Sequence, residues 1–549
     1  MQIKRIFAAS AVTLAALTTL VGCGSGDKKA KAPADTVSFT SKDAVATADS
    51  SVVTDLISAQ QLMNTMDGLY RYEGKDLKPA MSTKIVKPTN NGTVYTFPLR
   101  KDAKWSNGDP VTAQDFVFAW RRTVDPKTKS QYSFIYEGIT NAKDITDGKK
   151  AVDSLGVKAL DKHTLQVTLE KPVPYFDKLM AFQTFFPQNR KVVDKWGKKY
   201  GTNSKTLVFN GPYKLQDWSN GDNTWTQVKN NKYWNAKKVK VKKLKYQVMK
   251  DASTSLNLYQ SGKLDVAELT GDTSKQMKNS KDYTVQKQNA TCYLEFNQEK
   301  YPIFKNAKIR QAMSMTIDRQ QLTKKVLGNG TTAIGPVTAA NMAYDPQTKA
   351  DFVTQTKAEA DKYEKQNLKQ AKQLWKEGLA ETGNTGKKQS FTLLGDDLDI
   401  IKKQNEFLQS QLEKLPGLKI TVNNVPYKTR LERSQKRDFQ LVTTKWSADF
   451  PDPINFLTLF TSHNSYNNGP WKNAEYDQLI KKSLGEDANR PEQRWNDMKQ
   501  AQNILSKEQG VAPLYQDGQA YLVNSRVKHL DYGPGGMYNM VSLRIKDQK

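Results

Sequence analysis

The hydrophobic and polar positions of the chain follow patterns that predict an α/β fold. Apolar and polar side chains alternate through residues 93–99, which is typical of a half-buried strand. Residues 113–122 then carry apolar side chains at helical spacing. Farther along, Asn306 is a helix-capping residue type, and the helical pattern that follows it continues as far as Leu327. Strands and helices are therefore expected throughout the chain.

The clearest succession of strands and helices lies between residues 361 and 460. Helical patterns near Leu374, Leu408 and Leu431 alternate with short apolar runs typical of strands, at residues 391–394, 419–425 and 439–444. Such alternation predicts a mainly parallel sheet with helices on both faces. Ligands of such sheets bind beyond the carboxyl ends of the strands. We therefore expect the segment from Lys445 onward to lie at a ligand-binding edge.

The first residues of the chain have the parts of a bacterial export signal. Two positive charges precede an apolar run over residues 6–20, which is too short to cross a bilayer. Small residues then precede Cys23, as in a bacterial lipobox, where the thiol is acylated and the cysteine becomes the new N-terminus. We expect a signal peptide over residues 1–22, a lipid on Cys23 and a flexible linker over residues 23–34, which hold the protein at the outer face of a membrane. The alternative is an ordinary cleaved signal with an incidental cysteine.

The composition is strongly basic, with 84 lysines and arginines, 56 acidic residues and a formal net charge of +28. The lysines are scattered over the whole length, and the chain has no arginine-rich stripe, zinc pattern or helix-turn-helix spacing. Nucleic acid is therefore not an expected partner. For an exported protein, this charge favours solubility and attraction to an anionic wall or membrane surface.

Residues with catalytic or metal-binding chemistry are few. The chain has three histidines and two cysteines, and it lacks the His-Glu-x-x-His, Cys-x-x-Cys and Gly-x-Ser-x-Gly motifs. With Cys23 used for the anchor, Cys292 has no partner for a disulfide, and its apolar surroundings are typical of a buried small side chain. We therefore expect neither an enzyme, nor a cofactor, nor a metal site.

Several phrases of the sequence resemble one family, and they occur in that family's order. Two of them are Trp105-Ser106-Asn107-Gly108-Asp109-Pro110 and Asn210-Gly211-Pro212-Tyr213-Lys214-Leu215. Others lie at residues 67–70, 173–176, 230–234, 310–319, 446–449 and 512–515. Together they are similar to the extracellular solute-binding proteins of family 5, and within these to the oligopeptide-binding lipoproteins of bacterial ABC importers. The similarity covers nearly the whole mature chain.

The resemblance implies a two-lobe, periplasmic-binding-protein-like (Venus flytrap) α/β fold with an additional inserted domain. Lobe I would be discontinuous, with segments at residues 35–70, 205–290 and 515–549. A helper domain would be inserted at residues 71–204, and lobe II would cover residues 296–512. Crossings near residues 291–297 and 512–516 would act as the hinge about which the lobes close on a ligand.

The resemblance also implies that a peptide lies between the lobes as an added strand. In family members, the segments matching Lys445, Trp446 and Ser447, and those matching Thr54 and Leu56, sandwich the peptide. Pairing with the main chain of the peptide gives affinity without reading its side chains.

Further positions of the implied site contact the end and the side chains of the peptide. The residue matching Asp449 receives the α-ammonium group, and Tyr427, Leu431 and Trp446 match positions that line side-chain pockets. Local sequence leaves two alternatives open. Asp449 could instead cap the turn before Pro451, and the aromatic rings could pack in the core.

The chain departs from some relatives at two places. Those relatives join the positions of Ala290 and Ser447 by a disulfide, and this chain has a cysteine at neither. In some relatives, basic residues hold the carboxylate of short peptides. The matching positions in this chain are Ser434 and Thr443. Either a nearby arginine replaces them, or the site accepts longer peptides; the candidate arginines are Arg430, Arg433 and Arg437.

The implied function is the capture of oligopeptides and their delivery to the permease of an ABC importer with its ATPases. We expect a monomer, anchored by lipid on the extracytoplasmic face of the cell membrane at a Gram-positive cell surface. A binder of one signalling peptide would share this fold. A third hypothesis is a surface adhesin or chaperone-like lipoprotein, whose binding through exposed charge would collapse at high salt.

Overall fold

The computed structural model describes residues 34–74, 76–533 and 536–546. The expected signal peptide (residues 1–22), Cys23 and the linker as far as residue 33 lie outside this range. Among the residues described, no helix is both long enough and apolar enough to cross a bilayer.

One large sheet of eleven strands runs through the molecule in the order β14-β13-β15-β11-β16-β10-β1-β9-β8-β7, and β12 pairs with β16. Its strands are β1 (Thr36–Ser41), β7 (Tyr213–Gln216), β8 (Thr224–Lys229), β9 (Lys243–Val248), β10 (Val266–Leu269), β11 (Tyr283–Phe296), β12 (Thr332–Ala333), β13 (Gln389–Asp396), β14 (Leu418–Val425), β15 (Leu441–Ser447) and β16 (Val511–Val523). The order of these strands brings segments from both ends of the chain into one sheet.

The directions of the strands correct the expectation of a mainly parallel sheet. Strand β13 pairs in parallel with β14 and β15, as the pattern of residues 361–460 predicts, and β1 pairs in parallel with β9 and β10. The pairs of β11 with β15 and β16, of β10 with β16, and of β8 with β7 and β9 are antiparallel. The sheet is therefore mixed. A run of buried apolar residues looks the same in either strand direction, so the pattern could not distinguish them.

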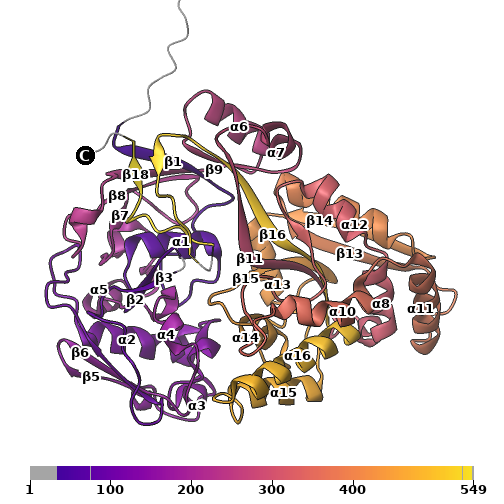
Figure 1. Ribbon diagram of the computed structural model, residues 1–549, viewed down its shortest axis with the longest axis horizontal. Coiled ribbons are helices and arrows are strands. Elements are labelled where there is room, and N and C mark those ends of the chain that lie inside the picture. The colour runs from indigo at the N-terminus through magenta and orange to yellow at the C-terminus, as the bar shows by residue number, and fades with distance from the viewer. Residues whose placement is uncertain (1–33, 75, 534–535, 547–549) are drawn as a thin grey trace, which may run out of the picture.

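The large sheet joins two lobes, which share the long strands β11 and β16 (Figure 1). The first lobe contains β1 and β7–β10, and the second lobe contains β13–β15. Strands β11 and β16 have 14 and 13 residues, and their pairing shifts register twice between Lys287 and Tyr293. The expected hinge segments, residues 291–297 and 512–516, overlap these two strands.

Helices pack against both lobes and against the inserted region. Those before β11 are α1 (Leu56–Thr65), α2 (Ala113–Val124), α3 (Ala142–Thr146), α4 (Phe176–Leu179), α5 (Arg190–Trp196), α6 (Ala252–Gln260) and α7 (Gly271–Met277). Those after β11 are α8 (Ala307–Met315), α9 (Arg319–Gln321), α10 (Phe352–Glu364), α11 (Leu368–Glu381), α12 (Asp399–Leu412), α13 (Tyr427–Gln435), α14 (Ile454–Leu457), α15 (Ala474–Leu484) and α16 (Pro491–Glu508). The strand and helix expected at residues 93–99 and 113–122 are confirmed as β4 (Val94–Pro98) and α2.

Residues 71–204 contain a separate three-stranded antiparallel sheet in the order β4-β6-β5. Helix α2 of this region begins with a capping box, in which the Thr112 backbone N–H donates to Asp115 at 2.7 Å. The strands of the smaller sheets are β2 (Tyr70–Glu73), β3 (Asp76–Pro79), β4 (Val94–Pro98), β5 (Val157–Asp161), β6 (Thr164–Thr168), β17 (Val527–Lys528) and β18 (Arg544–Ile545).

The long helix expected after Asn306 is broken. Asn306 caps α8 as predicted, but α8 ends at Met315. Asp318 caps a new short helix, which continues as a π-helix to Leu327. The break places the buried Arg319 so that it donates to backbone carbonyls, including that of Pro513 at 2.7 Å. These carbonyl contacts, which come from outside the helix, explain why the apolar pattern alone did not predict the break.

Candidate functional site

A cavity of about 570 Å³ lies between the two lobes. Its wall includes the segment before α1 and parts of β1 from the first lobe, and parts of α13 and β15 from the second lobe. All eight residues expected to contact a peptide line this cavity: Thr54, Leu56, Tyr427, Leu431, Lys445, Trp446, Ser447 and Asp449. A cavity of this size falls within the range of ligand-binding sites.

The carboxylate of Asp449 is held by two long hydrogen bonds. The hydroxyl of Tyr132 donates to Oδ1 at 3.4 Å, and Nδ2 of Asn455 donates to Oδ2 at 3.3 Å. Asn455 also accepts the backbone N–H of Asp449 through its Oδ1, at 3.1 Å. Because both contacts to the carboxylate are near the upper limit of hydrogen-bond length, its oxygens have room for further donors.

The turn that follows Asp449 is capped by a different residue. The carboxylate of Asp452 accepts the backbone N–H of Ile454 at 3.0 Å. The same carboxylate accepts both terminal guanidinium nitrogens of Arg494, each at 2.9 Å. The hydrogen bonds of this turn thus give the capping role to Asp452, which leaves the carboxylate of Asp449 to the cavity.

Three aromatic rings pack together beside Asp449. The ring centroid of Tyr132 lies 5.4 Å from that of Tyr466 and 6.1 Å from that of Trp446. Trp446 and Tyr466 are themselves 4.7 Å apart. Tyr132 comes from the inserted region, Trp446 from β15 and Tyr466 from the segment before α15, so distant parts of the chain meet here. We call Asp449 and these three rings the Asp449 pocket.

Burial raises the pKa of Asp449 to about 7, and the hydrogen bonds from Asn455 and Tyr132 only partly oppose this rise. Among the described residues, no lysine or arginine forms an ion pair with Asp449. A carboxylate that has left water without a counter-ion is costly, so the site favours a ligand that brings a positive charge. The phenol groups of Tyr132 and Tyr466 stay protonated, because burial and the nearby carboxylate raise their pKa far above the usual value.

Strand β15 has a backbone edge that no neighbouring strand covers. It pairs with β11 along its whole length, from Leu441 to Ser447, but it pairs with β13 only at Leu441 and Val442. Among the residues that the structure describes, the second edge of β15 is therefore open around Thr443 to Lys445. Such an edge can pair with an extended chain.

The first lobe contributes the residues that begin α1. Asp55 caps this helix by accepting the backbone N–H of Ser58 at 2.8 Å, and the cap fixes the backbone between Thr54 and Leu56. The side chain of Leu56 is 43% exposed, which is unusual for a large apolar residue, and it lines the cavity. This wall therefore offers an apolar contact surface.

Tyr427 and Leu431 lie one turn apart on α13, and both line the cavity. Between them, Arg430 is buried, and its Nε donates to Asp396 at 2.9 Å. The guanidinium of Arg430 also lies 5.3 Å from the ring centroid of Tyr427. Arg430 is thus committed to contacts within the protein.

Other basic residues near the cavity are also paired with acidic ones. The pairs and their shortest distances are Lys445–Asp517 at 2.7 Å, Lys42–Glu268 at 2.9 Å, Arg433–Asp438 at 2.9 Å and Arg437–Glu299 at 2.9 Å. Each of the three candidate arginines therefore already has an acidic partner within the protein. We call the pairs Arg430–Asp396, Lys445–Asp517 and Lys42–Glu268 the paired wall.

Contacts between the two sides of the cavity hold the lobes together. Lys250, which follows β9, pairs with Asp397, which follows β13, at 2.7 Å. The ring of Tyr175 in the inserted region stacks on Phe450 with centroids 4.4 Å apart. Together with the contact between Tyr132 and Asp449, these interactions show that the inserted region and the first lobe both touch the second lobe.

Sequence reasoning missed Tyr132, Asn455 and Tyr466. Tyr132 lies 317 positions from Asp449, and no local motif marks it. Asn455 is only six positions after Asp449, in a turn rich in Asp and Pro, and this proximity was the one signal available. The Asp449 pocket therefore depends on tertiary contacts that the local pattern does not contain.

Two expectations about Cys292 and its neighbours can be compared with the structure. Cys292 is buried and free, and burial raises the pKa of its thiol to about 11, so the prediction of a buried small side chain is confirmed. Ala290 lies directly opposite Ser447 in the β11–β15 pair, so the two positions are neighbours even without cysteines. Within the described part of the chain, no cluster of three or more His, Cys, Asp or Glu side chains is arranged to hold a metal ion.

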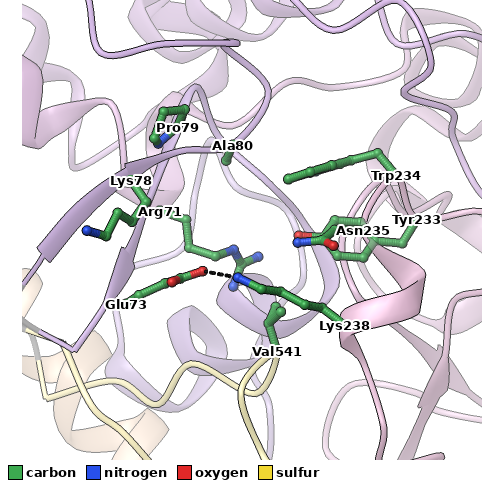
Figure 2. Close-up of a pocket in the computed structure, with 10 residues that line it drawn as sticks. All are labelled: Arg71, Glu73, Lys78, Pro79, Ala80, Tyr233, Trp234, Asn235, Lys238 and Val541. Atoms are coloured by element: carbon green, nitrogen blue, oxygen red, sulfur yellow. Dashed lines mark hydrogen bonds and ion pairs between the residues drawn. The ribbon is translucent and has the colours of Figure 1, made fainter.

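A second, smaller cavity of about 200 Å³ lies beside β2 and β3 (Figure 2). Its charged groups already have partners. Glu73 pairs with Lys238 at 3.4 Å, and Arg71 donates to Asp67 and to two backbone carbonyls. Because these charges are compensated, this cavity lacks the unpaired group that distinguishes the Asp449 pocket.

Comparisons with known proteins agree with this geometry. Residues 76–468 match the family model described as bacterial extracellular solute-binding proteins, family 5 middle. The chain is 34% identical to a dipeptide-binding protein of Lactococcus lactis subsp. cremoris, and the alignment covers 100% of both chains. A solved structure of Listeria monocytogenes OppA bound to peptide is 37% identical and has a TM-score of 0.88 over 93% of this chain and 99% of that one. The pheromone receptor PrgZ is 36% identical, with a TM-score of 0.88 over 93% of this chain and 100% of its own.

Two structures of one relative indicate the arrangement of the lobes. The murein tripeptide binding protein MppA of Escherichia coli has a TM-score of 0.84 to this chain, with 29% identity and coverage of 93% and 98%. An unliganded open form of MppA has a TM-score of only 0.62, with 28% identity and coverage of 94% and 98%. The present structure is therefore less similar to that open form than to the other MppA structure. The contacts across the cavity agree with a closed arrangement.

Proposed function

Because the chain belongs to the bacterial extracellular solute-binding proteins of family 5, we propose that it captures oligopeptides outside the cytoplasm and delivers them to an ABC importer. The observation that carries this proposal is the Asp449 pocket, a desolvated carboxylate without a cationic partner in a cavity between two lobes. Every unmodified peptide carries an α-ammonium group at one end. That group supplies the missing charge and donates to the oxygens of Asp449.

In this proposal the peptide lies as an extended strand with its N-terminus at Asp449. Its main chain lies along β15 at Lys445, Trp446 and Ser447, beside the open edge around Thr443 to Lys445, and the opposite side is held by Thr54 and Leu56. Tyr427, Leu431 and Trp446 then contact its side chains. The support is that all these residues line one cavity.

The C-terminus of the peptide has no obvious fixed counter-ion. Arg430, Arg433 and Arg437 are each paired within the protein, and the positions of Ser434 and Thr443 are uncharged. We infer that no salt bridge to the C-terminus of the peptide restricts its length. The site then accepts peptides of different lengths.

The proposed place of action is the extracytoplasmic face of the cell membrane, at a Gram-positive surface. The lipid on Cys23 anchors a monomer, and the linker of residues 23–34 tethers the folded part. Replacement Cys23→Ser should move the protein from the membrane fraction to the medium or leave it as precursor. Normal membrane retention of this variant would contradict the anchor.

The protein acts by binding and release rather than by catalysis. We propose that lobe I (residues 35–70, 205–290 and 515–549) and lobe II (residues 296–512) close about the hinge segments 291–297 and 512–516. The helper domain of residues 71–204 then contributes Tyr132 to the closed site. Support comes from the register shifts of β11 and from the contacts of Tyr132.

Calorimetric titration with three forms of one tetrapeptide tests the proposal. The free peptide should bind tightly, the N-acetylated form at least ~30-fold more weakly, and the C-terminally amidated form within about threefold of the free peptide. Equal binding of the free and acetylated forms would overturn the role of the Asp449 pocket. Absence of binding to any peptide in a mixed library would overturn the function itself.

The similarity to the pheromone receptor PrgZ supports a second candidate, a binder of one signalling peptide. Both candidates use the same site and differ in selectivity. Native mass spectrometry of ligands that copurify with the protein distinguishes them. A series of unrelated peptides indicates nutrient import, and a single species indicates signalling.

A further inference from the structure

We propose that a lysine-rich face of the first lobe docks onto the anionic headgroups of the membrane that carries the anchor. The face lies on β9 and on the loop before it, and we call it the lysine face: Lys237, Lys238, Lys240, Lys242, Lys243 and Lys245. The choice of a membrane as partner rests on the lipid anchor proposed at Cys23.

Positive charge is more concentrated on this segment than in most of the chain. Residues 223–250 contain nine lysines and no aspartate or glutamate. The net charge of the whole chain is positive, but most lysines elsewhere are interspersed with acidic residues. A segment of one sign is typical of a surface that binds the opposite sign.

The strands of the lobe direct these lysines away from the core. On β9, Leu244 and Tyr246 are buried, whereas Lys243 and Lys245 between them are exposed. On the neighbouring β8, Trp225 is buried on the other face, where its indole donates to Gln61 of α1 at 2.9 Å. One face of the sheet therefore packs on α1, and the opposite face presents lysines to solvent.

The positive charges of the lysine face are poorly compensated within the protein. Lys242 is 70% exposed and lies 3.9 Å from Asp35, and Lys238 is 55% exposed and lies 3.4 Å from Glu73. The other four lysines of the face form no ion pair in the described part of the chain. Such long, exposed pairs contribute little, so the face keeps most of its charge.

A nearby side chain responds to this crowding of like charge. Lys229 has a lowered pKa, first because it is partly desolvated and then because Lys240 and Lys242 repel its proton. Its ammonium group donates to the carbonyl of Val239 at 2.7 Å rather than to an acid. Like charge therefore crowds the surroundings of the lysine face, and this favours the binding of an external anion.

The lysine face adjoins the point where the linker enters the folded part. Thr36 at the start of β1 pairs directly with Lys243 of β9. Figure 1 shows β1, β8, β9 and β18 gathered at this corner of the molecule. The linker of residues 23–34 spans at most about 40 Å when extended, so a lipid on Cys23 keeps this corner close to the membrane.

Docking in this orientation leaves the peptide cavity free. Tyr246 of β9 and Phe39 of β1 line the cavity, and they point to the side of the sheet opposite to Lys243 and Lys245. A lysine close to an anionic membrane strengthens binding by about fivefold. Six exposed lysines would thus orient the tethered protein without a fitted pocket.

Vesicle cosedimentation tests the lysine face. Every described helix and strand begins after residue 34, so the chain from residue 24 onward, without the lipid, keeps all of them. We expect it to bind vesicles of equal parts phosphatidylglycerol and phosphatidylcholine, and not vesicles of phosphatidylcholine alone. Replacing Lys240, Lys242, Lys243 and Lys245 by Gln should weaken binding at least tenfold, and 1 M salt should abolish it.

A matched control removes the same charge elsewhere. In the second lobe, Lys365, Lys369, Lys372 and Lys376 are exposed at the end of α10 and along α11, and their replacement by Gln should weaken vesicle binding less than threefold. Equal losses in both variants would overturn the proposal, because total charge would then explain the binding. Thermal unfolding shows whether each variant is folded.

Two further readouts separate this proposal from others. Soluble poly(glycerol phosphate) presents the same phosphate chemistry without a lipid surface, and tight binding to it with no binding to vesicles would overturn a membrane partner. Peptide affinity of the lysine-face variant should equal that of the original chain. A failure of peptide binding in the original chain would count against the proposed function and not against the lysine face, which the vesicles test without peptide or anchor.

Discussion

The Asp449 pocket and the paired wall are two regions of one cavity that treat charge in opposite ways. In the paired wall, each buried or half-buried charge has a counter-ion at 2.7–2.9 Å. In the Asp449 pocket, a carboxylate of comparable burial has only neutral donors at 3.3–3.4 Å. This difference distinguishes charges that stabilise the fold from a charge that is available to bind a ligand. A charge that the protein itself compensates is structural, and one that it leaves uncompensated can select a ligand.

The largest expected effect comes from breaking a pair of the paired wall. Arg430→Met should lower the free energy of unfolding by about 3–5 kcal/mol, because it leaves Asp396 buried without its counter-ion. Chemical denaturation of the empty protein measures this loss. Arg433→Met removes a more exposed pair and should cost at most about 1 kcal/mol. Adding Asp396→Asn to Arg430→Met should restore part of the loss, and no restoration would contradict the pairing argument.

A substitution in the Asp449 pocket should weaken peptide binding without lowering the stability of the empty protein. Asp449→Asn removes a desolvated charge, so the empty protein should be as stable as the original or more so. The same change should weaken peptide binding by roughly 2–5 kcal/mol, because the α-ammonium group loses its counter-ion.

Acetylation of the peptide closes a double-mutant cycle on this contact. N-acetylation should weaken binding to the original protein, yet cost the Asp449→Asn variant little more. Calorimetry of both proteins with both peptides provides the four values. Simple addition of the two losses would show that Asp449 does not contact the N-terminus.

A smaller effect concerns pH. Burial raises the pKa of Asp449 in the empty protein to about 7, above the ordinary value of an aspartate. An aspartate in the unfolded chain has a pKa of about 3.9. The contribution of Asp449 to the stability of the empty folded protein is therefore fully present below that pH and is lost as pH rises through 7. Peptide binding requires the ionised carboxylate, so affinity should fall as pH decreases below 7.

Titrations at pH 7.5 and 5.5 measure this dependence. We expect a loss of about tenfold or more at the lower pH, with proton release on binding. The Asp449→Asn variant is the control, because its affinity should change little over the same interval. Equal pH dependence of the two proteins would assign the effect to another group.

The smallest expected effect concerns the contact between lobes. Lys250→Gln removes the ion pair with Asp397, whose side chains are 35% and 25% exposed, and should shift the lobes toward an open arrangement by about 0–1 kcal/mol. Small-angle scattering of the empty protein at low salt measures the change. Lys357→Gln removes a pair within α10 and should leave the scattering profile unchanged. A similar change in both variants would contradict a role for Lys250 in closure.

Sequence patterns predicted those parts of the fold that depend on local periodicity. The strands and helices of residues 361–460 were predicted because each has one apolar face that its own residues define. The direction of β11 was not predicted, because its buried part, residues 290–296, shows no difference between parallel and antiparallel neighbours. The break after Met315 depends on Arg319 reaching the carbonyl of Pro513, far along the chain.

In the site, too, the sequence indicated neighbouring residues but not those that only the fold brings together. The family resemblance indicated Asp449 and the segment around Trp446, which lie next to each other in sequence. Tyr132 and Tyr466 come from other segments and reach Asp449 only through the fold. The absence of a counter-ion for Asp449 is also a property of the assembled cavity. A sequence can show that a carboxylate is present, but only the surroundings show that it is unpaired.

The position of β16 has a consequence for the biogenesis of the protein. Residues 511–523 form a strand in the middle of the large sheet, between β10 and β11, although every other strand of this sheet precedes them in the sequence. Until this segment has been exported, β10 and the neighbouring part of β11 present unpaired edges that can recruit other chains. Neither lobe can therefore mature independently during secretion, and premature termination before residue 511 leaves both lobes without the strand β16 that they share.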